Sequence, residues 1–284
     1  MKIVSSAQQM RRVAERLRRD GQGIGFVPTM GYLHEGHLAL VRAARRENDT
    51  VVVSIFVNPS QFGPDEDYRR YPRDFKRDRS LLEAQKADYL FAPSVKTMYP
   101  EGFQTGVRVE KLSGPLCGVS RPVHFGGVAT VVAKLLNLVA PDRVYLGQKD
   151  YQQFKVVERM VRDLDFPVEA RRVATVREKD GLAMSSRNVY LSAEERRQAP
   201  ALYRALCRAV ALIRSGERHA GKVRQALVQG ARSAPRARVD YAEIVDAGTL
   251  EPVVKLKKGR TLLAALAVFF GETRLIDNCL VKVP

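Results

Sequence analysis

Short apolar runs alternate with helically spaced stretches along the N-terminal part of the chain. Residues 5–20 have helical spacing, residues 23–27 form an apolar run that ends at Pro28, and helical spacing resumes after Gly36. Residues 51–57 follow as a continuous run rich in β-branched side chains, which is typical of a strand buried on both faces of a parallel sheet. This stretch therefore predicts a strand, a crossover helix and a second parallel strand.

The same alternation continues to about residue 176. Helices are predicted over residues 74–85, 128–139 and 152–163, and strands over residues 88–91, 143–146 and 168–176. Gly126 and Gly127 stand just before the second of these helices. Repeated strand and helix in this order predicts an α/β fold, a Rossmann-like open parallel sheet with helices on both faces. Such sheets bind ligands at the carboxyl ends of their strands.

The pattern changes after about residue 177. A capping box at Ser192 and Glu195 predicts a long helix that runs through Ala211. Another helix over residues 223–231 and strands over 239–245, 262–269 and 274–281 complete this part. We therefore expect a larger domain over residues 1–177 and a smaller C-terminal α+β domain over residues 178–284.

Composition and charge limit the classes of protein that fit. The chain has 284 residues, no run of eighteen apolar positions, and a charged start without the features of a signal peptide, so we expect a cytoplasmic protein without a membrane span. Its three cysteines are far apart and odd in number, which favours free thiols over disulfides or a zinc site. The net charge of +17 indicates either a solvated basic surface or an anionic partner.

Two of the four histidines, His34 and His37, lie three residues apart between the first strand and the next helix. If this turn is helical, both imidazoles project to the same side, and Gly36 between them permits close approach of a ligand. The N–H groups of a helix start attract phosphate, so the turn suits a polyphosphate. Alternatively these are polar loop residues. A metal pair lacks a third ligand, because His124 and His219 lie in unrelated segments, and no Walker phosphate loop is present.

Further polar residues follow predicted strands. Asn58 and Gln61 come after a buried strand, where their neutral amides could bond a hydroxyl or carboxylate, and Gln153 could complete that pocket. Lys149 follows another strand, so that its ammonium could reach phosphates, or could instead pair with Asp150 at the surface. Each of these is also an ordinary loop residue when taken alone.

Four sequence blocks resemble a known family. The string His34-Glu35-Gly36-His37 resembles the His-x-Gly-His signature of the nucleotidyltransferase superfamily. The longer string over residues 26–37, with blocks at 53–62, 146–153 and 181–188, resembles the pantothenate synthetase (pantoate–β-alanine ligase) family in particular. The resemblance covers most of residues 1–192. One departure is Gln148, which stands where many relatives have glutamate.

The resemblance implies an ATP-dependent condensation of pantoate with β-alanine through a pantoyl adenylate, with Mg²⁺ bound to ATP and its protein ligands unassigned. Residues 1–177 would bind nucleotide and pantoate, and residues 178–284 would form a lid. The implied ATP-binding residues are Met30, Gly31, Tyr32, Leu33, His34, Glu35, Gly36, His37, Gly147, Gln148, Lys149, Asp150, Val176, Met184, Ser185, Ser186 and Arg187.

The resemblance also implies roles for single residues. Gln61 and Gln153 hold pantoate, with Asn58 close by. The implied catalytic set consists of His34, His37, Lys149 and Arg187. His37 is the implied proton donor, although spacing alone does not separate it from His34.

The family resemblance further implies a homodimer formed through the larger domain. Two other readings remain open. Another nucleotidyltransferase, such as a cytidylyltransferase, would share the histidine turn but should lack the pocket at Asn58 and Gln61. A nucleic-acid-binding protein would explain the net charge, but no RNA-binding module is visible, so we expect neither nucleic acid nor membrane as a partner.

Overall fold

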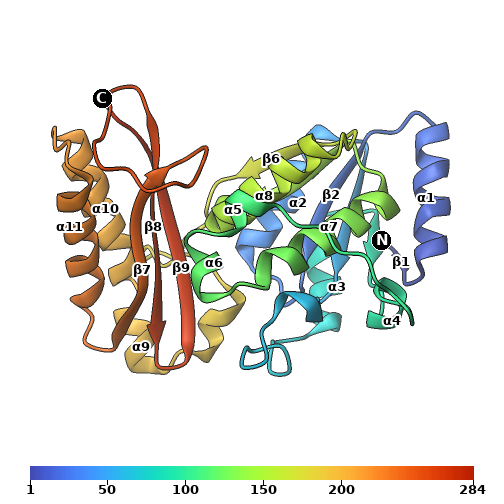
Figure 1. The fold of residues 1–284 in the computed structure, drawn as a ribbon. Helices are drawn as coiled ribbons and strands as arrows, with labels where there is room; N and C mark the ends of the chain where they lie inside the picture. Colours follow the sequence, from blue (N-terminus) through green and yellow to red (C-terminus); the bar gives the residue numbers. More distant parts are fainter. The chain divides into compact units, whose positions relative to one another are not determined.

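Six parallel strands form the sheet of the first structural unit in the computed structural model, which describes residues 1–284. The strands are β1 (Lys2–Val4), β2 (Ile24–Thr29), β3 (Thr50–Ile55), β4 (Tyr89–Phe91), β5 (Arg143–Gly147) and β6 (Glu169–Val173). Their order is β1-β4-β3-β2-β5-β6, and every neighbouring pair is parallel. Figure 1 labels β1, β2 and β6 among these strands. The predicted Rossmann-like sheet is confirmed.

Helices cover both faces of this sheet. α1 (Ala7–Arg19) contacts α7 (His124–Val139), whereas α2 (Glu35–Glu47) contacts α3 (Phe75–Ala84). The connections that contain α1 and α7 run across the sheet in one direction, and those that contain α2 and α3 run in the opposite direction. Because parallel crossover connections are right-handed, the two pairs of helices lie on opposite faces. The direction reverses between β2 and β5, and an open sheet binds ligands at the carboxyl ends of strands at such a switch point.

Three main elements of this unit differ from the prediction. The sequence predicts no strand before the first helix, whereas β1 forms there at Lys2–Val4. β2 continues through Pro28 to Thr29, whereas the sequence predicts a break at Pro28. β5 pairs with β2 at Gly25 and Phe26, so Pro28, which has no N–H to donate, lies past that pairing. α7 begins at His124, so that Gly126 and Gly127 lie inside the helix rather than before it.

Further elements complete the first unit. They are α4 (Val95–Met98), α5 (Glu110–Ser113), the 3₁₀ helix η1 (Pro59–Gln61) and most of α8 (Tyr151–Asp163), which connects β5 to β6. A further 3₁₀ turn, η2 (Gln148–Asp150), follows β5, and its residues Lys149 and Asp150 belong to the second unit. None of the helices combines the length and the apolar character that a membrane span requires.

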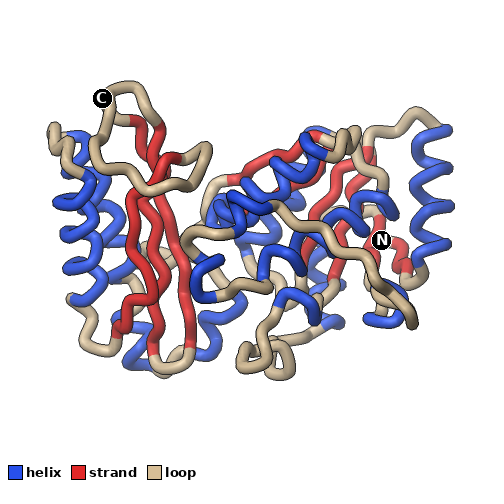
Figure 2. Tube along the Cα trace, in the orientation of Figure 1, coloured by secondary structure: helices blue, strands red, loops and turns tan.

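Three long antiparallel strands form the sheet of the second unit, in the order β7-β8-β9 (Figure 2). They are β7 (Ala237–Asp246), β8 (Thr261–Phe270) and β9 (Thr273–Lys282). α10 (Ala201–Arg214) and α11 (Ala220–Arg232) contact each other and this sheet, and their apolar faces join the central strand in one buried core. The remaining elements are α6 (Cys117–Ser120), η3 (Ser186–Tyr190) and α9 (Ala193–Gln198). The predicted smaller α+β part is confirmed.

The long helix predicted from Ser192 to Ala211 is instead two helices, α9 and α10, which are separated at Ala199 and Pro200. Pro200 has no N–H to donate to the carbonyl four residues earlier, so the helical ladder is interrupted there. The capping box predicted at Ser192 is present, with Glu195 N–H donating to Ser192 Oγ over 3.3 Å.

Contacts between residues divide the chain into two units. The first consists of Met1–Ser113, Arg121–Gln148 and Gln153–Ala174, and the second of Gly114–Ser120, Lys149–Gln152 and Thr175–Pro284. Two short segments that precede residue 177 are thus grouped with the antiparallel sheet. The functional division at residue 177, into a nucleotide-binding domain and a lid, stays a prediction.

Candidate active site

The chain turns sharply after β2, at the switch point of the sheet. Gly31 and Tyr32 have φ angles of +85° and +50°, which L side chains rarely adopt. A Cβ atom on Gly31 would lie 3.0 Å from Ile55 Cγ2 and 3.1 Å from Asp78 Oδ2, so a side chain there would crowd these two groups in addition to straining the backbone. The turn carries Met30 to Leu33 and leads directly into α2.

Asp78 fixes this turn. The two oxygens of its carboxylate accept hydrogen bonds from the backbone N–H groups of Tyr32 and Leu33, each over 2.7 Å. Asp78 belongs to α3 and is 1% exposed. Burial raises the pKa of the Asp78 carboxyl, and the two backbone hydrogen bonds oppose that rise. Sequence reasoning missed Asp78, because its partners are main-chain groups about 45 positions earlier.

The two candidate histidines hold the start of α2. Gly36 N–H donates to His34 Nδ1 over 3.1 Å, and His34 N–H donates to His37 Nδ1 over 3.3 Å. The ring centroids are 4.1 Å apart. Because Nδ1 accepts a hydrogen bond in both rings, the neutral imidazoles carry their protons on Nε2, from which they can donate to an anion.

The N–H groups at this helix start differ from the expectation. The sequence suggests that they face a phosphate, yet Gly36 N–H is bonded to His34 Nδ1, and His37 N–H donates to the His34 carbonyl over 2.8 Å. A phosphate at this turn would therefore be bonded chiefly by the imidazoles. Glu35 is the first residue of α2, where a carboxylate is favoured by the helix dipole.

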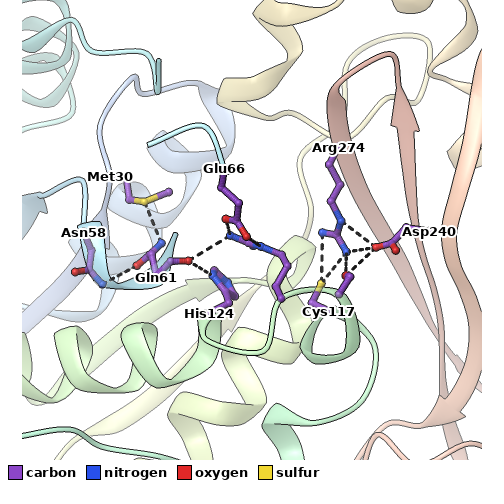
Figure 3. A network of polar contacts seen from close by, with 10 residues as sticks. Met30, Asn58, Gln61, Glu66, Cys117, His124, Asp240 and Arg274 are labelled. Carbon is purple, nitrogen blue, oxygen red and sulfur yellow. Dashed lines mark hydrogen bonds and ion pairs between the residues drawn. The ribbon is translucent and has the colours of Figure 1, made fainter. Parts of the chain in front are cut away.

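Asn58 holds the side-chain amide of Gln61 in place (Figure 3). Its Nδ2 atom donates to Gln61 Oε1 and to the Gly127 carbonyl, each over 3.1 Å, and its Oδ1 atom accepts from Tyr99 Oη over 2.7 Å. Asn58 is 1% exposed and caps η1. Its side chain therefore orients Gln61, and its predicted position near a bound substrate stays a prediction.

Gln61 connects Asn58 to the histidine turn. Its Nε2 atom donates to Met30 Sδ over 3.1 Å, as the dashed line in Figure 3 shows. Its carbonyl lies 2.9 Å from His124 Nδ1, in α7. The structure therefore brings together two candidates, Met30 and Gln61, that the sequence assigns to different ligands.

Gly127 permits the close contact between α7 and η1. A Cβ atom on Gly127 would lie 2.3 Å from the Ser60 carbonyl oxygen and 2.6 Å from Gln61 N, which no packing adjustment short of moving η1 could relieve. A Cβ on Gly126 would meet nothing within 4 Å. Gly127 is a second positioning residue that sequence reasoning missed; its position beside a predicted helix is the signal that could have suggested it.

The end of β5 supplies more candidates. Gly147 is the last residue of β5, which lies beside β2 in the sheet. Gln148 follows, and its Oε1 atom accepts a hydrogen bond from Arg172 Nη1 over 2.8 Å. Gln153 is partly buried near the start of α8. These three candidates belong to the first unit, together with His34, His37, Asn58 and Gln61.

Lys149 and Asp150 belong to the second unit and are described within it. Lys149 Nζ lies 3.8 Å from Asp150 Oδ2, and the Lys149 side chain is 20% exposed. An ion pair this long holds the ammonium weakly, so Lys149 can exchange this partner for a phosphate. The Lys149 carbonyl accepts a hydrogen bond from Asn278 Nδ2 over 2.8 Å.

The other candidates of the second unit form one connected segment. Met184 N–H donates to the Val176 carbonyl over 3.0 Å, so these two predicted ATP-binding residues are neighbours. Ser185 Oγ accepts from Arg187 N–H over 3.3 Å and caps η3, in which Ser186 is 6% exposed. The backbone around Arg187 is thus set by a local turn.

The chain offers no dedicated cage for a metal. No group of three His, Cys, Asp or Glu side chains in the structure could hold a metal ion. A magnesium ion whose ligands are mostly phosphate oxygens and water would need no such group of side chains. No protein ligand is assigned to it.

Comparisons with known proteins agree over the whole chain. The family profile described as Pantoate-beta-alanine ligase matches residues 2–280. The chain is 58% identical to the pantothenate synthetase of Thermotoga neapolitana over 98% of this chain and 99% of that one. It is 56% identical to the pantothenate synthetase of Moorella thermoacetica over 100% of this chain and 99% of that one.

Solved structures give the same result. The crystal structure of pantothenate synthetase from Thermus thermophilus superposes with a TM-score of 0.93 and 54% identity, over 99% of this chain and 100% of that one. Pantoate-beta-alanine ligase from Francisella tularensis, complexed with beta-gamma ATP and beta-alanine, superposes with a TM-score of 0.81 and 34% identity, over 99% and 97%. The profile, the relatives and the fold agree: the chain belongs to the pantoate–β-alanine ligase family.

Proposed function

We propose that the chain joins pantoate to β-alanine at the expense of ATP, through a pantoyl adenylate, and releases pantothenate, AMP and pyrophosphate. The contact between Gln61 Nε2 and Met30 Sδ carries this proposal, because it joins the amide that would hold pantoate to the turn that would hold ATP. The related ligase complexed with beta-gamma ATP and beta-alanine supports these two substrates.

In the first step a carboxylate oxygen of pantoate attacks the α-phosphorus of ATP, and pyrophosphate leaves. Negative charge grows on the phosphate oxygens, and the Nε2–H groups of His34 and His37 are the donors that would bond it. Lys149 and Arg187 would add positive charge at the same phosphates. A magnesium ion bound to the phosphates would neutralise part of their charge. Catalysis then rests on positioned donors rather than on a covalent enzyme intermediate.

In the second step the amine of β-alanine attacks the acyl carbon of the adenylate, the amide bond forms, and AMP leaves. Gln61 and Gln153 would hold the pantoyl group during both steps, with Asn58 keeping the Gln61 amide in place. We assign His37 as the proton donor by its place in the family motif. Motion of the Ser185–Arg187 segment over the nucleotide would exclude water from the adenylate.

We also propose a homodimer formed through the larger domain and a cytoplasmic location. The three unpaired cysteines, Cys117, Cys207 and Cys279, support a reducing compartment. Sedimentation of the purified chain tests the dimer, and a single monomeric species at micromolar concentration would contradict it.

The assay that tests the reaction measures AMP formation with pantoate, β-alanine or both. We expect stoichiometric AMP only when both acids are present with ATP. Transfer of CMP from CTP to an acceptor, without AMP formation from ATP, would favour a cytidylyltransferase instead. Full activity with Gln61→Ala at low pantoate concentration would contradict the proposed pantoate site.

A further inference from the structure

Two consecutive polar residues of β9, Asp277 and Asn278, are almost fully buried, with exposed fractions of 2% and 4%. Neither belongs to a motif that the proposed reaction uses. A buried carboxylate or amide is costly unless it is hydrogen-bonded, so its partners indicate why it is there. Because consecutive side chains of a strand point to opposite faces, the two residues can hold two different segments.

Asn278 holds the backbone of Lys149. Its Nδ2 atom donates to the Lys149 carbonyl over 2.8 Å. Lys149 lies in the short turn η2, so this contact from β9 fixes the origin of its long side chain. The partners lie about 129 positions apart in sequence, and both belong to the second unit.

Asp277 holds the base of the segment that carries Arg187. Its carboxylate accepts two hydrogen bonds from Arg177, over 2.6 Å and 2.9 Å. The Arg177 guanidinium lies 3.9 Å from the centre of the Tyr203 ring and donates to the Gly181 carbonyl over 3.1 Å. Arg177 also pairs with Ala183 in an antiparallel bridge, directly before Met184.

We propose that Asp277 and Asn278 are positioning residues for the adenylation step: this dipeptide is a common anchor that sets the backbone of Lys149 and of the Met184–Arg187 segment. One rigid strand would then aim both cations at the same triphosphate. The inference rests on the proposed function, because it takes Lys149 and Arg187 as the groups that bind ATP. Asp277 and Asn278 act through these residues and touch no substrate themselves.

A double-mutant cycle tests the anchor. Asn278→Ala should lower the kcat of pantoate-dependent pyrophosphate exchange about 100-fold, the loss that a displacement near 1 Å can cause, with the KM for β-alanine in the full reaction unchanged. In a Lys149→Ala background the same substitution should cost no more than about 2-fold, because its effect passes through Lys149. A purely structural role would instead lower the melting temperature and give equal losses in both backgrounds, which would overturn the proposal.

A second cycle pairs Asp277→Asn with Arg187→Ala, and it decides the question should Asn278→Ala fail to fold. The matched control is Asp240→Asn, which removes the ion pair that Arg274 forms with Asp240 over 2.7 Å in the same sheet (Figure 3). The fold-loss in kcat caused by Asp240→Asn should be the same, within about 2-fold, with and without Lys149→Ala. Additive losses in both anchor cycles would contradict the proposal.

Failure of the anchor is distinguishable from failure of the proposed function. If the wild-type chain shows no pantoate-dependent exchange, the function is wrong. ATP affinity measured by calorimetry then replaces kcat in both cycles. Non-additive losses of ATP affinity would still support the anchor, and additive ones would refute it.

Discussion

His34 and His37 are linked through the backbone: the N–H group of His34 donates to Nδ1 of His37 over 3.3 Å. With the bond from Gly36 N–H to His34 Nδ1, this contact makes both imidazoles part of the helix cap. The caps fix the tautomer of each ring, so that one nitrogen stabilises the fold and the other is a donor. The structural and the catalytic roles of each histidine can therefore be separated by mutation.

His37→Asn and His37→Gln separate these roles. Asparagine places its Oδ1 near the position of Nδ1, so His37→Asn should keep the cap and change the free energy of unfolding by less than about 0.5 kcal/mol. It lacks the Nε2–H donor, so kcat for adenylation should fall about 100- to 1000-fold. Glutamine offers a donor near the Nε2 position but loses the cap, so His37→Gln should lose about 1 kcal/mol of stability and keep more activity. Thermal unfolding and turnover of both variants check this, and equal activities would contradict the assigned tautomer.

Gly127→Ala should displace η1. The new methyl group would overlap the Ser60 carbonyl and the Gln61 backbone, so we expect a loss of about 1–3 kcal/mol of stability and a raised KM for pantoate. Gly126→Ala is the matched control in the same helix, where the methyl group meets nothing within 4 Å. It should instead gain about 1 kcal/mol from helix propensity. Urea unfolding and pantoate titration measure both effects, and an unchanged KM for Gly127→Ala would separate η1 from the pantoate site.

Asp78→Asn should loosen the turn that leads to His34. The asparagine side chain has one carbonyl oxygen and an amide NH₂ in place of the second oxygen, so it cannot accept both hydrogen bonds, from Tyr32 N–H and Leu33 N–H, in the same geometry. We expect a cost of about 1–3 kcal/mol in stability and a raised KM for ATP. Asp74→Asn on the same helix is the control, because Asp74 is a helix cap and asparagine caps equally well. Similar losses for both variants in urea unfolding would show that Asp78 has no special role.

Tyr145 should make the fold sensitive to alkaline pH. Burial, together with the adjacent Glu47 carboxylate, raises the pKa of the Tyr145 hydroxyl to about 12. A folded-state pKa above the unfolded value of about 10 means that the stabilisation is complete below pH 10 and is lost as the pH rises toward 12. Tyr145→Phe removes this group, so its difference in unfolding free energy from wild type should shrink as the pH rises from about 10 to about 12, the window set by the two pKa values. A difference that stays constant over this range would refute the assignment.

Patterns local in sequence predicted the fold. The alternation of buried β-branched runs and helical spacing predicts five of the six parallel strands and the helices between them, whereas the three-residue strand β1 carries no such signal. Proline was a poor guide to where an element ends. A break was predicted at Pro28, which lies inside β2, and no break was predicted at Pro200, which interrupts a pattern that otherwise indicates one helix.

Residues of the candidate site could be predicted where they belong to a sequence motif. They could not be predicted where their role depends on contacts with residues far away in the sequence. The histidine turn and the amides at Asn58 and Gln61 stand out along the chain, because each follows the end of a strand. Asp78, Gly127 and Asn278 do not, since their partners lie far away in sequence and are mostly backbone atoms. Asn58 stands out by its residue type and its position after a strand. It is buried and its side chain is bonded to four neighbouring residues, so it orients Gln61, while its contact with a substrate stays a prediction.

Isotope exchange tests the central claim most directly. Purified chain is incubated with ATP, pantoate and labelled pyrophosphate, without β-alanine, and label in ATP is counted. The proposed adenylate predicts exchange that requires pantoate and that falls at least about 100-fold when His34 and His37 are both replaced by asparagine. Absence of pantoate-dependent exchange in the folded wild-type chain, or an undiminished rate in that double variant, would contradict the account.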